Sequence, residues 1–328
     1  MSETADFDPG PWRGHDFGSA RRSYDATAGR SYGDAKAKKK VNADLLPKNL
    51  TTDSKSPLVI VCDVTGSMGE WPATIFSKLP YLEIEGREYL GDDMEICFAA
   101  VGDIFCDEYP LQARPFTKGT ALKDELAKLV IEAKGGDAPE SYDMAALYFA
   151  RNVSMPKAFR PILIMIGDEL MHEVVDPVKA EELVYAKVTG RITVESIFEE
   201  LKQKYSVYYI RKGDTQDSRR DPVHKRWAEL IGEDHIVPLP EAGRVVDVIF
   251  GILAKETDRV DYFRKEIEGR QKLDQVETVY KSLRSVHGGT AKGSSAGHTG
   301  KSIMRKTKSK TKPSAKDDGA GGDTKPLA

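Results

Sequence analysis

Short apolar runs alternate along the chain with segments whose apolar positions recur at helical spacing. The runs at Pro57–Cys62, Met94–Val101 and Pro161–Ile166 are continuous, which is typical of buried parallel strands. Further strands are predicted at Tyr109–Phe116, Ser206–Ile210 and His235–Val237, and the first of these contains two prolines that favour a sheet edge. Helical spacing predicts helices over Thr120–Ala133, Pro139–Ala150, Pro177–Lys204, His224–Ile231 and Gly243–Glu268.

Strands that alternate with helices indicate an α/β fold. We expect a doubly wound, mostly parallel open sheet with helices on both faces. The predicted folded domain spans residues 56–271. Residues 1–55 are rich in small and charged residues and lack a periodic apolar face, so we expect a disordered N-terminal arm. Residues 272–328 are expected to contain the end of the last helix and then a basic, disordered C-terminal arm of similar composition.

Composition separates an acidic body from a basic tail. The 328 residues carry a formal net charge of −3, but residues 57–283 carry −12 and residues 284–328 carry +7. The chain has no 18-residue apolar stretch and no apolar run near its start, so we expect neither a membrane span nor a secretory signal. Three cysteines are too few for a disulfide framework, which favours a reducing compartment and a cytoplasmic location.

Oxygen-bearing side chains follow the predicted strands. Asp63, Thr65 and Ser67 alternate on a turn after the first strand, and Asp168 follows the strand Pro161–Ile166. A glycine-rich loop, Gly135–Ser141, opens a predicted helix between them. Because ligands bind beyond the carboxyl ends of strands in such sheets, these oxygens are expected to converge. Carboxylates and hydroxyls are hard ligands that suit Mg²⁺ or Mn²⁺.

The pattern Asp63-x-Thr65-x-Ser67 after a buried strand resembles the metal-ion-dependent adhesion site of von Willebrand factor A (vWA) domains. The resemblance covers residues 56–271, and the sequences of the later loops resemble those of the intracellular, largely microbial members more than those of the extracellular adhesion receptors. It implies that Thr65 and Ser67 bind the metal through hydroxyls, Asp63 through its carboxylate directly or by water, and that Asp168 supports the site. It also implies a protein partner whose acidic residue completes the coordination, with AAA+ ATPases or multiprotein assemblies as common associates.

Two positions depart from the family pattern. Thr65 replaces a serine and keeps the hydroxyl. The second loop offers Asp137, Glu140 or Ser141 where the family has threonine, and the sequence does not choose among them. With Asp137 as a ligand, three carboxylates would face one cation, which would tighten metal binding and weaken the attraction for an acidic partner.

Two other functions compete with a non-catalytic binding module. The motif Asp63-x-Thr65-Gly66 also resembles the aspartyl-phosphate loop of haloacid-dehalogenase-like phosphohydrolases, in which the aspartate attacks phosphorus beside Mg²⁺. Against it, Thr65 stands where those hydrolases usually carry a second aspartate, and no lysine can be assigned to the phosphate. In the third alternative the protein is a scaffold whose basic segment, residues 284–316, binds either an acidic partner or nucleic acid, the latter without sequence preference.

His172-Glu173 lacks the second histidine of a zinc protease motif, so a lining role at the metal face is predicted for His172.

Overall fold

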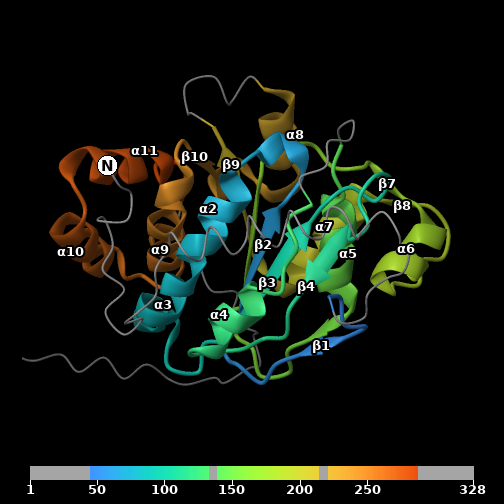
Figure 1. The fold of residues 1–328 in the computed structure, drawn as a ribbon, viewed down its shortest axis with the longest axis horizontal. Coiled ribbons are helices and arrows are strands. Elements are labelled where there is room, and N and C mark those ends of the chain that lie inside the picture. The colour runs from blue at the N-terminus through green and yellow to red at the C-terminus, as the bar shows by residue number, and fades with distance from the viewer. Residues whose placement is uncertain (1–44, 133–138, 214–220, 287–328) are drawn as a thin grey trace, which may run out of the picture. The chain divides into compact units, whose positions relative to one another are not determined.

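The computed structural model describes residues 45–132, 139–213 and 221–286, and contains a central six-stranded sheet (Figure 1). Its strands are β2 Leu58–Asp63, β3 Ile96–Val101, β4 Leu111–Ala113, β6 Ile162–Gly167, β9 Ser206–Lys212 and β10 Ile236–Leu239. Their order across the sheet is β10-β9-β6-β2-β3-β4. Every pairing is parallel except that of the edge strand β4 with β3. The mostly parallel α/β sheet predicted from the sequence is confirmed.

Helices cover both faces of the sheet (Figure 1). One layer is formed by α2 Trp71–Lys78, α3 Leu82–Leu90 and α9 Val245–Glu256. The other is formed by α5 Tyr142–Arg151, α7 Val194–Lys204 and α8 Pro222–Ile231. Successive strand residues point to opposite faces, so Ile60 packs in the first layer while Val59 and Val61 pack in the second. This double burial explains why the central strands are apolar throughout.

Several predicted helices are shorter than their periodicity suggested. The segment predicted at Thr120–Ala133 forms α4 Ala121–Leu126 only. Beyond it the backbone N–H and carbonyl of Val130 pair with the side chain of Gln112, each at 2.8 Å, which holds this part of the chain beside β4. The segment Pro177–Lys204 divides into α6 Pro177–Val184 and α7, with Tyr185 in a left-handed conformation at the end of α6.

The predicted helix Gly243–Glu268 is likewise two helices. Asp258 has a φ of 58°, and the chain turns there between α9 and α10 Val260–Arg270. A further helix, α11 Leu273–Ser282, follows beyond the predicted domain bound at 271 and buries Val276 and Val279 in the core. Apolar periodicity alone did not find the turn because a left-handed aspartate does not change the apolar pattern on either side.

The packed residues also begin before residue 56. Strand β1 Leu50–Thr51 pairs in parallel with β5 Val153–Ser154 in a separate two-stranded sheet, and Leu46 and Leu50 are buried. A second two-stranded sheet joins β7 Val174–Val175 to β8 Ile192–Thr193. The predicted disorder of residues 1–44 and 287–328, and the loop residue Asp137, lie outside the described residues. None of the helices in the described ranges is long and apolar enough to cross a membrane.

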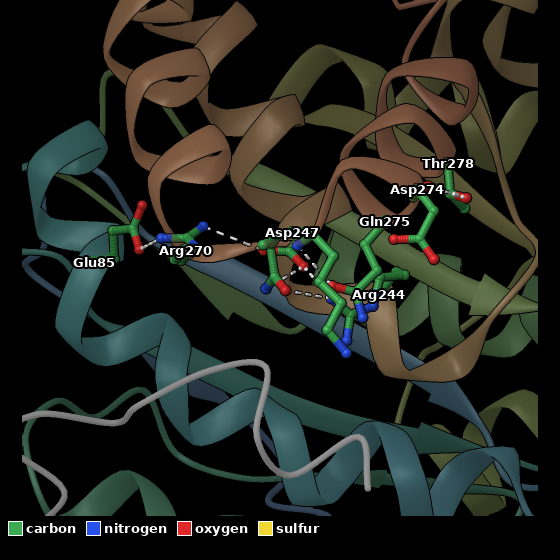
Figure 2. A network of polar contacts seen from close by, with 9 residues as sticks. Glu85, Arg244, Asp247, Arg270, Asp274, Gln275 and Thr278 are labelled. Atoms are coloured by element: carbon green, nitrogen blue, oxygen red, sulfur yellow. Dashed lines mark hydrogen bonds and ion pairs between the residues drawn. The ribbon is translucent and has the colours of Figure 1, made fainter. Parts of the chain in front are cut away.

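A network of largely buried charged side chains joins α10 to the helices α3 and α9 (Figure 2). The Arg270 guanidinium on α10 lies between Glu85 on α3 and Asp247 on α9, bonding directly to Glu85 and 3.2 Å from Asp247 Oδ1. Arg244 approaches the other oxygen of Asp247 at 3.3 Å, and Gln271 donates to that oxygen at 3.1 Å. The network therefore links three helices through one carboxylate that is almost fully buried.

Candidate metal centre

The carboxyl ends of β2, β3, β6 and β9 meet at one edge of the sheet, because these strands are parallel and adjacent. Asp63 is the last residue of β2 and is fully buried. Its Oδ1 accepts the backbone N–H of Thr65 at 2.8 Å and the Thr65 hydroxyl at 2.6 Å. These two bonds close the turn that leads into the short 3₁₀ helix Gly66–Met68.

The two hydroxyls of the turn lie between Asp63 and the carboxylate that follows the next strand of the sheet. The oxygens of Thr65 and Ser67 are 3.1 Å apart, and Ser67 donates to Asp168 Oδ1 at 2.9 Å. Asp168 follows directly on β6, the neighbour of β2 in the sheet. The structure therefore brings together four of the predicted ligands, Asp63, Thr65, Ser67 and Asp168, from segments about a hundred residues apart.

Glu140 and Ser141 of the second loop have different partners. The Ser141 hydroxyl accepts the backbone N–H of Ile104 at 2.8 Å and is thereby engaged in holding the loop that follows β3. The Glu140 carboxyl instead interacts with the Thr65 hydroxyl, and burial together with the charges of Asp63 and Asp103 raises its pKa to about 8. The predicted alternative Asp137 lies outside the described residues.

Burial makes the negative charge of this site costly. It raises the pKa of Asp63 to about 6, although the hydrogen bonds from Thr65 and Tyr142 act in the opposite direction. The Oε2 atom of Glu140 is buried and accepts no hydrogen bond from the described residues. Buried carboxylates in this state are stabilised by a bound cation.

The donor set fits a hard divalent cation. Oxygens from carboxylates and hydroxyls are the ligands that Mg²⁺ and Mn²⁺ prefer, and the side chains of Asp63, Thr65, Ser67 and Asp168 offer only such oxygens. Within the described residues, no group of three or more Asp, Glu, His or Cys side chains is placed so that it could hold a metal ion by itself.

Two residues of the site were not found from the sequence. The Tyr142 hydroxyl on α5 donates to Asp63 Oδ2 at 2.5 Å. Lys212, the last residue of β9, donates to Asp168 Oδ2 at 3.1 Å and to the Ser67 carbonyl at 2.6 Å. Lys212 stands two residues beyond the predicted strand Ser206–Ile210, so the strand-end rule that found Asp63 and Asp168 could have found it too.

His172 lies beside the same edge and contacts Asp103 and Phe105 of the loop that follows β3. Its Nε2 is 3.8 Å from Asp103 Oδ1, and its ring meets that of Phe105 edge to face at 5.0 Å. Burial lowers the pKa of His172, so its neutral form is favoured. Phe105 is 66% exposed, which gives this side of the edge an apolar surface.

The sequence matches no known family model and no curated protein. Solved structures with a similar fold include the pilus adhesin SpaC from Lactobacillus rhamnosus GG in its open conformation (8% identity, TM-score 0.46), which is aligned over 64% of this chain and 31% of its own. The proximal thread matrix protein 1 from the mussel byssus aligns over 63% of this chain and 49% of its own (10% identity, TM-score 0.43). A structure of the same mussel protein with a zinc-occupied MIDAS motif has 11% identity and a TM-score of 0.42, over 64% of this chain and 49% of its own.

The chain thus spans less than half the length of each of these proteins. Likenesses at such low identity and TM-score establish neither a family nor a function, and we infer neither from them.

Proposed function

We propose that this protein is a non-catalytic binding module in which Asp63, Thr65, Ser67 and Asp168 hold a divalent cation, with Mg²⁺ or Mn²⁺ preferred, and an acidic residue of a partner protein completes the coordination. The observation that supports it best is the convergence of these oxygens: Thr65 donates to Asp63, Ser67 donates to Asp168, and the two hydroxyl oxygens lie 3.1 Å apart. Glu140 is the ligand that we assign to the second loop, because Ser141 is engaged elsewhere.

The phosphohydrolase alternative requires Asp63 to attack phosphorus. Lys212 beside Asp168 provides the lysine that the sequence did not reveal, which favours this alternative. However, Asp63 has no exposed surface, and both of its oxygens already accept hydrogen bonds, from Thr65 and from Tyr142. An attacking carboxylate must be reached by a phosphoryl group, which is far larger than a metal ion, so the burial of Asp63 agrees better with support of a cation than with nucleophilic attack.

The cysteines support a place of action inside the cell. Cys62, Cys97 and Cys106 are all free, and the first two are buried in the core. Free thiols persist in a reducing compartment. The AAA+ ATPase partner that the family resemblance implies stays a prediction, as does binding through the basic segment 284–316, most of which lies outside the described residues.

Calorimetric titration of Mg²⁺ and Mn²⁺, with thermal melting alongside, tests the proposal. We expect binding and a raised melting temperature in the wild type, and loss of both in Asp63→Ala and Asp168→Asn. Asp92→Asn is the matched control, because Asp92 is an exposed carboxylate just before β3, at the opposite edge of the sheet. Equal binding in Asp168→Asn, or none in the wild type, would overturn the proposal.

A further inference from the structure

Lys212 places a cation of the protein's own inside the candidate metal centre. Its ammonium donates to Asp168 Oδ2 and to the carbonyl of Ser67, two groups that belong to the proposed site. The side chain is 23% exposed, so the ammonium is largely shielded while part of it still faces solvent. A lysine held in this way interacts electrostatically with any metal bound beside it.

The charge of the loaded centre depends on this lysine. Asp63, Asp168 and the assigned ligand Glu140 contribute three negative charges and Lys212 one positive charge, so a divalent cation brings the total to zero. Without Lys212 the same loaded centre would carry a charge of −1. A negative centre repels an anionic partner group, whereas a neutral centre does not.

Within the described residues, the ammonium retains a hydrogen-bond donor for a ligand. Lysine has three N–H donors, and two are used by Asp168 and Ser67. No third hydrogen-bond acceptor for Lys212 is found among residues 45–132, 139–213 and 221–286, and its Nζ also lies 5.6 Å from the centroid of the Trp71 ring. A carboxylate beside the metal could therefore accept this proton.

We propose that Lys212 is a specificity-determining residue of the metal centre: it holds Asp168 by one N–H, and with another it binds the same partner carboxylate that completes the metal coordination. This inference rests on the proposed function. It assigns the site a preference for side-chain carboxylates, because the oxygens of one carboxylate can bridge the cation and the ammonium.

Metal titration forms the first arm of the test. Removing a positive charge near the cation strengthens its binding, so Lys212→Met is expected to bind Mn²⁺ on the order of tenfold more tightly than the wild type. Lys212→Arg keeps the charge and is expected to bind as the wild type does. Lys179→Met is the matched control, because the Lys179 ammonium lies over the Phe105 ring at 3.6 Å and contacts none of the proposed ligands.

Acetate forms the second arm, as a probe for the partner's carboxylate. Protein loaded with Mn²⁺ is mixed with ¹³C-labelled acetate, and broadening of the acetate signal reports binding close to the metal. At equal Mn²⁺ loading we expect several-fold less broadening with Lys212→Met than with the wild type, Lys212→Arg or Lys179→Met. EDTA should abolish the broadening in all four proteins. Lys212→Gln provides a second neutral variant if Lys212→Met does not fold.

The two proposals fail in different ways. If the wild type binds no Mn²⁺, the proposed function is wrong and this inference falls with it. If the wild type binds Mn²⁺ but the neutral variants bind metal and acetate as the wild type does, the site stands and the role of Lys212 is overturned. Weaker Mn²⁺ binding in the neutral variants would also overturn it, because Lys212 would then only position Asp168.

Discussion

The Tyr142 hydroxyl donates a hydrogen bond of 2.5 Å to Asp63 Oδ2, and both side chains are fully buried. This bond joins the start of α5 to the end of β2, and it acts on the oxygen of Asp63 that Thr65 leaves free. Two loops of the candidate metal centre are thereby fixed to each other through a carboxylate rather than through backbone pairing.

Tyr142→Phe should therefore destabilise the protein by about 1–3 kcal/mol, because it leaves a buried carboxylate oxygen without a donor. Urea denaturation of both proteins measures the difference. Tyr205→Phe is the control, since that buried hydroxyl makes only a long contact of 3.4 Å to the Phe149 carbonyl. Equal stability of Tyr142→Phe and wild type would mean that the bond to Asp63 contributes nothing.

The same hydroxyl explains the glycine before Asp168. A Cβ added at Gly167 would overlap the Tyr142 hydroxyl and lie 3.2 Å from the Cβ of Asp63. Overpacking at buried positions costs about 1–3 kcal/mol, so Gly167→Ala should lower stability by at least that amount. Gly269→Ala is the control, because nothing lies within 4 Å of a Cβ placed there.

Thermal melting of the two alanine variants, and of Gly167→Ala combined with Tyr142→Phe, checks this explanation. Because the added methyl group and the hydroxyl compete for one space, the double variant should be less destabilised than the sum of the two single variants. Additive effects would show that Gly167 is required for a reason unrelated to Tyr142.

Glu140 and Ser141 should respond differently to substitution. Glu140→Gln removes the charge of the assigned second-loop ligand, so Mn²⁺ affinity should fall on the order of tenfold while the fold is retained. Ser141→Ala removes the acceptor for the Ile104 N–H, so stability should fall by about 1 kcal/mol while Mn²⁺ affinity changes little. Calorimetry and urea denaturation separate the two effects. The reverse pattern would make Ser141 the ligand.

The sequence was most informative where one strong periodicity decided the structure. The apolar runs located the central strands, and the strand-end rule then located Asp63 and Asp168, because parallel strands bring their carboxyl ends to one edge. Glu140 and Ser141 could not be distinguished, since the choice depends on which side chain the loop after β3 engages, and that is a tertiary contact. Tyr142 was missed for the same reason, because its hydroxyl meets a residue 79 positions away.

The arrangement of the C-terminal helices, by contrast, could not be predicted from the sequence. The turn at Asp258 and the helix α11 depend on packing against α9, where Leu283 approaches Gly251 so closely that a Cβ there would lie 2.9 Å from Leu283 Cδ2. Such contacts leave little trace in apolar periodicity. The ion network of Arg270 is equally invisible in the sequence, because Glu85 and Arg270 are 185 residues apart.

That network predicts a pH-dependent loss of stability in Arg270→Met. Burial raises the pKa of both Asp247 and Glu85 above their ordinary values of 3.8 and 4.5, and Arg270 opposes the rise in each. A raised pKa means that the folded state binds more protons than the unfolded state between the ordinary pKa and the raised one. Stability therefore falls as the pH rises through that range. Without Arg270 both pKa values rise further, so the pH range over which stability is lost extends upward. The loss of stability should therefore be about 3 kcal/mol at pH 8 and clearly smaller at pH 5.

Urea denaturation of Arg270→Met and wild type at both pH values measures this difference. Arg259→Met is the matched control, because Arg259 pairs with Glu88 at 3.8 Å and both side chains are at least half exposed. Exposed pairs contribute about 0–1 kcal/mol, so that variant should stay close to the wild type at either pH. A deficit in Arg270→Met that is equal at pH 5 and pH 8 would show that Arg270 stabilises the helices by packing on Phe250, whose ring centroid lies 5.5 Å from its guanidinium carbon, rather than through the two carboxylates.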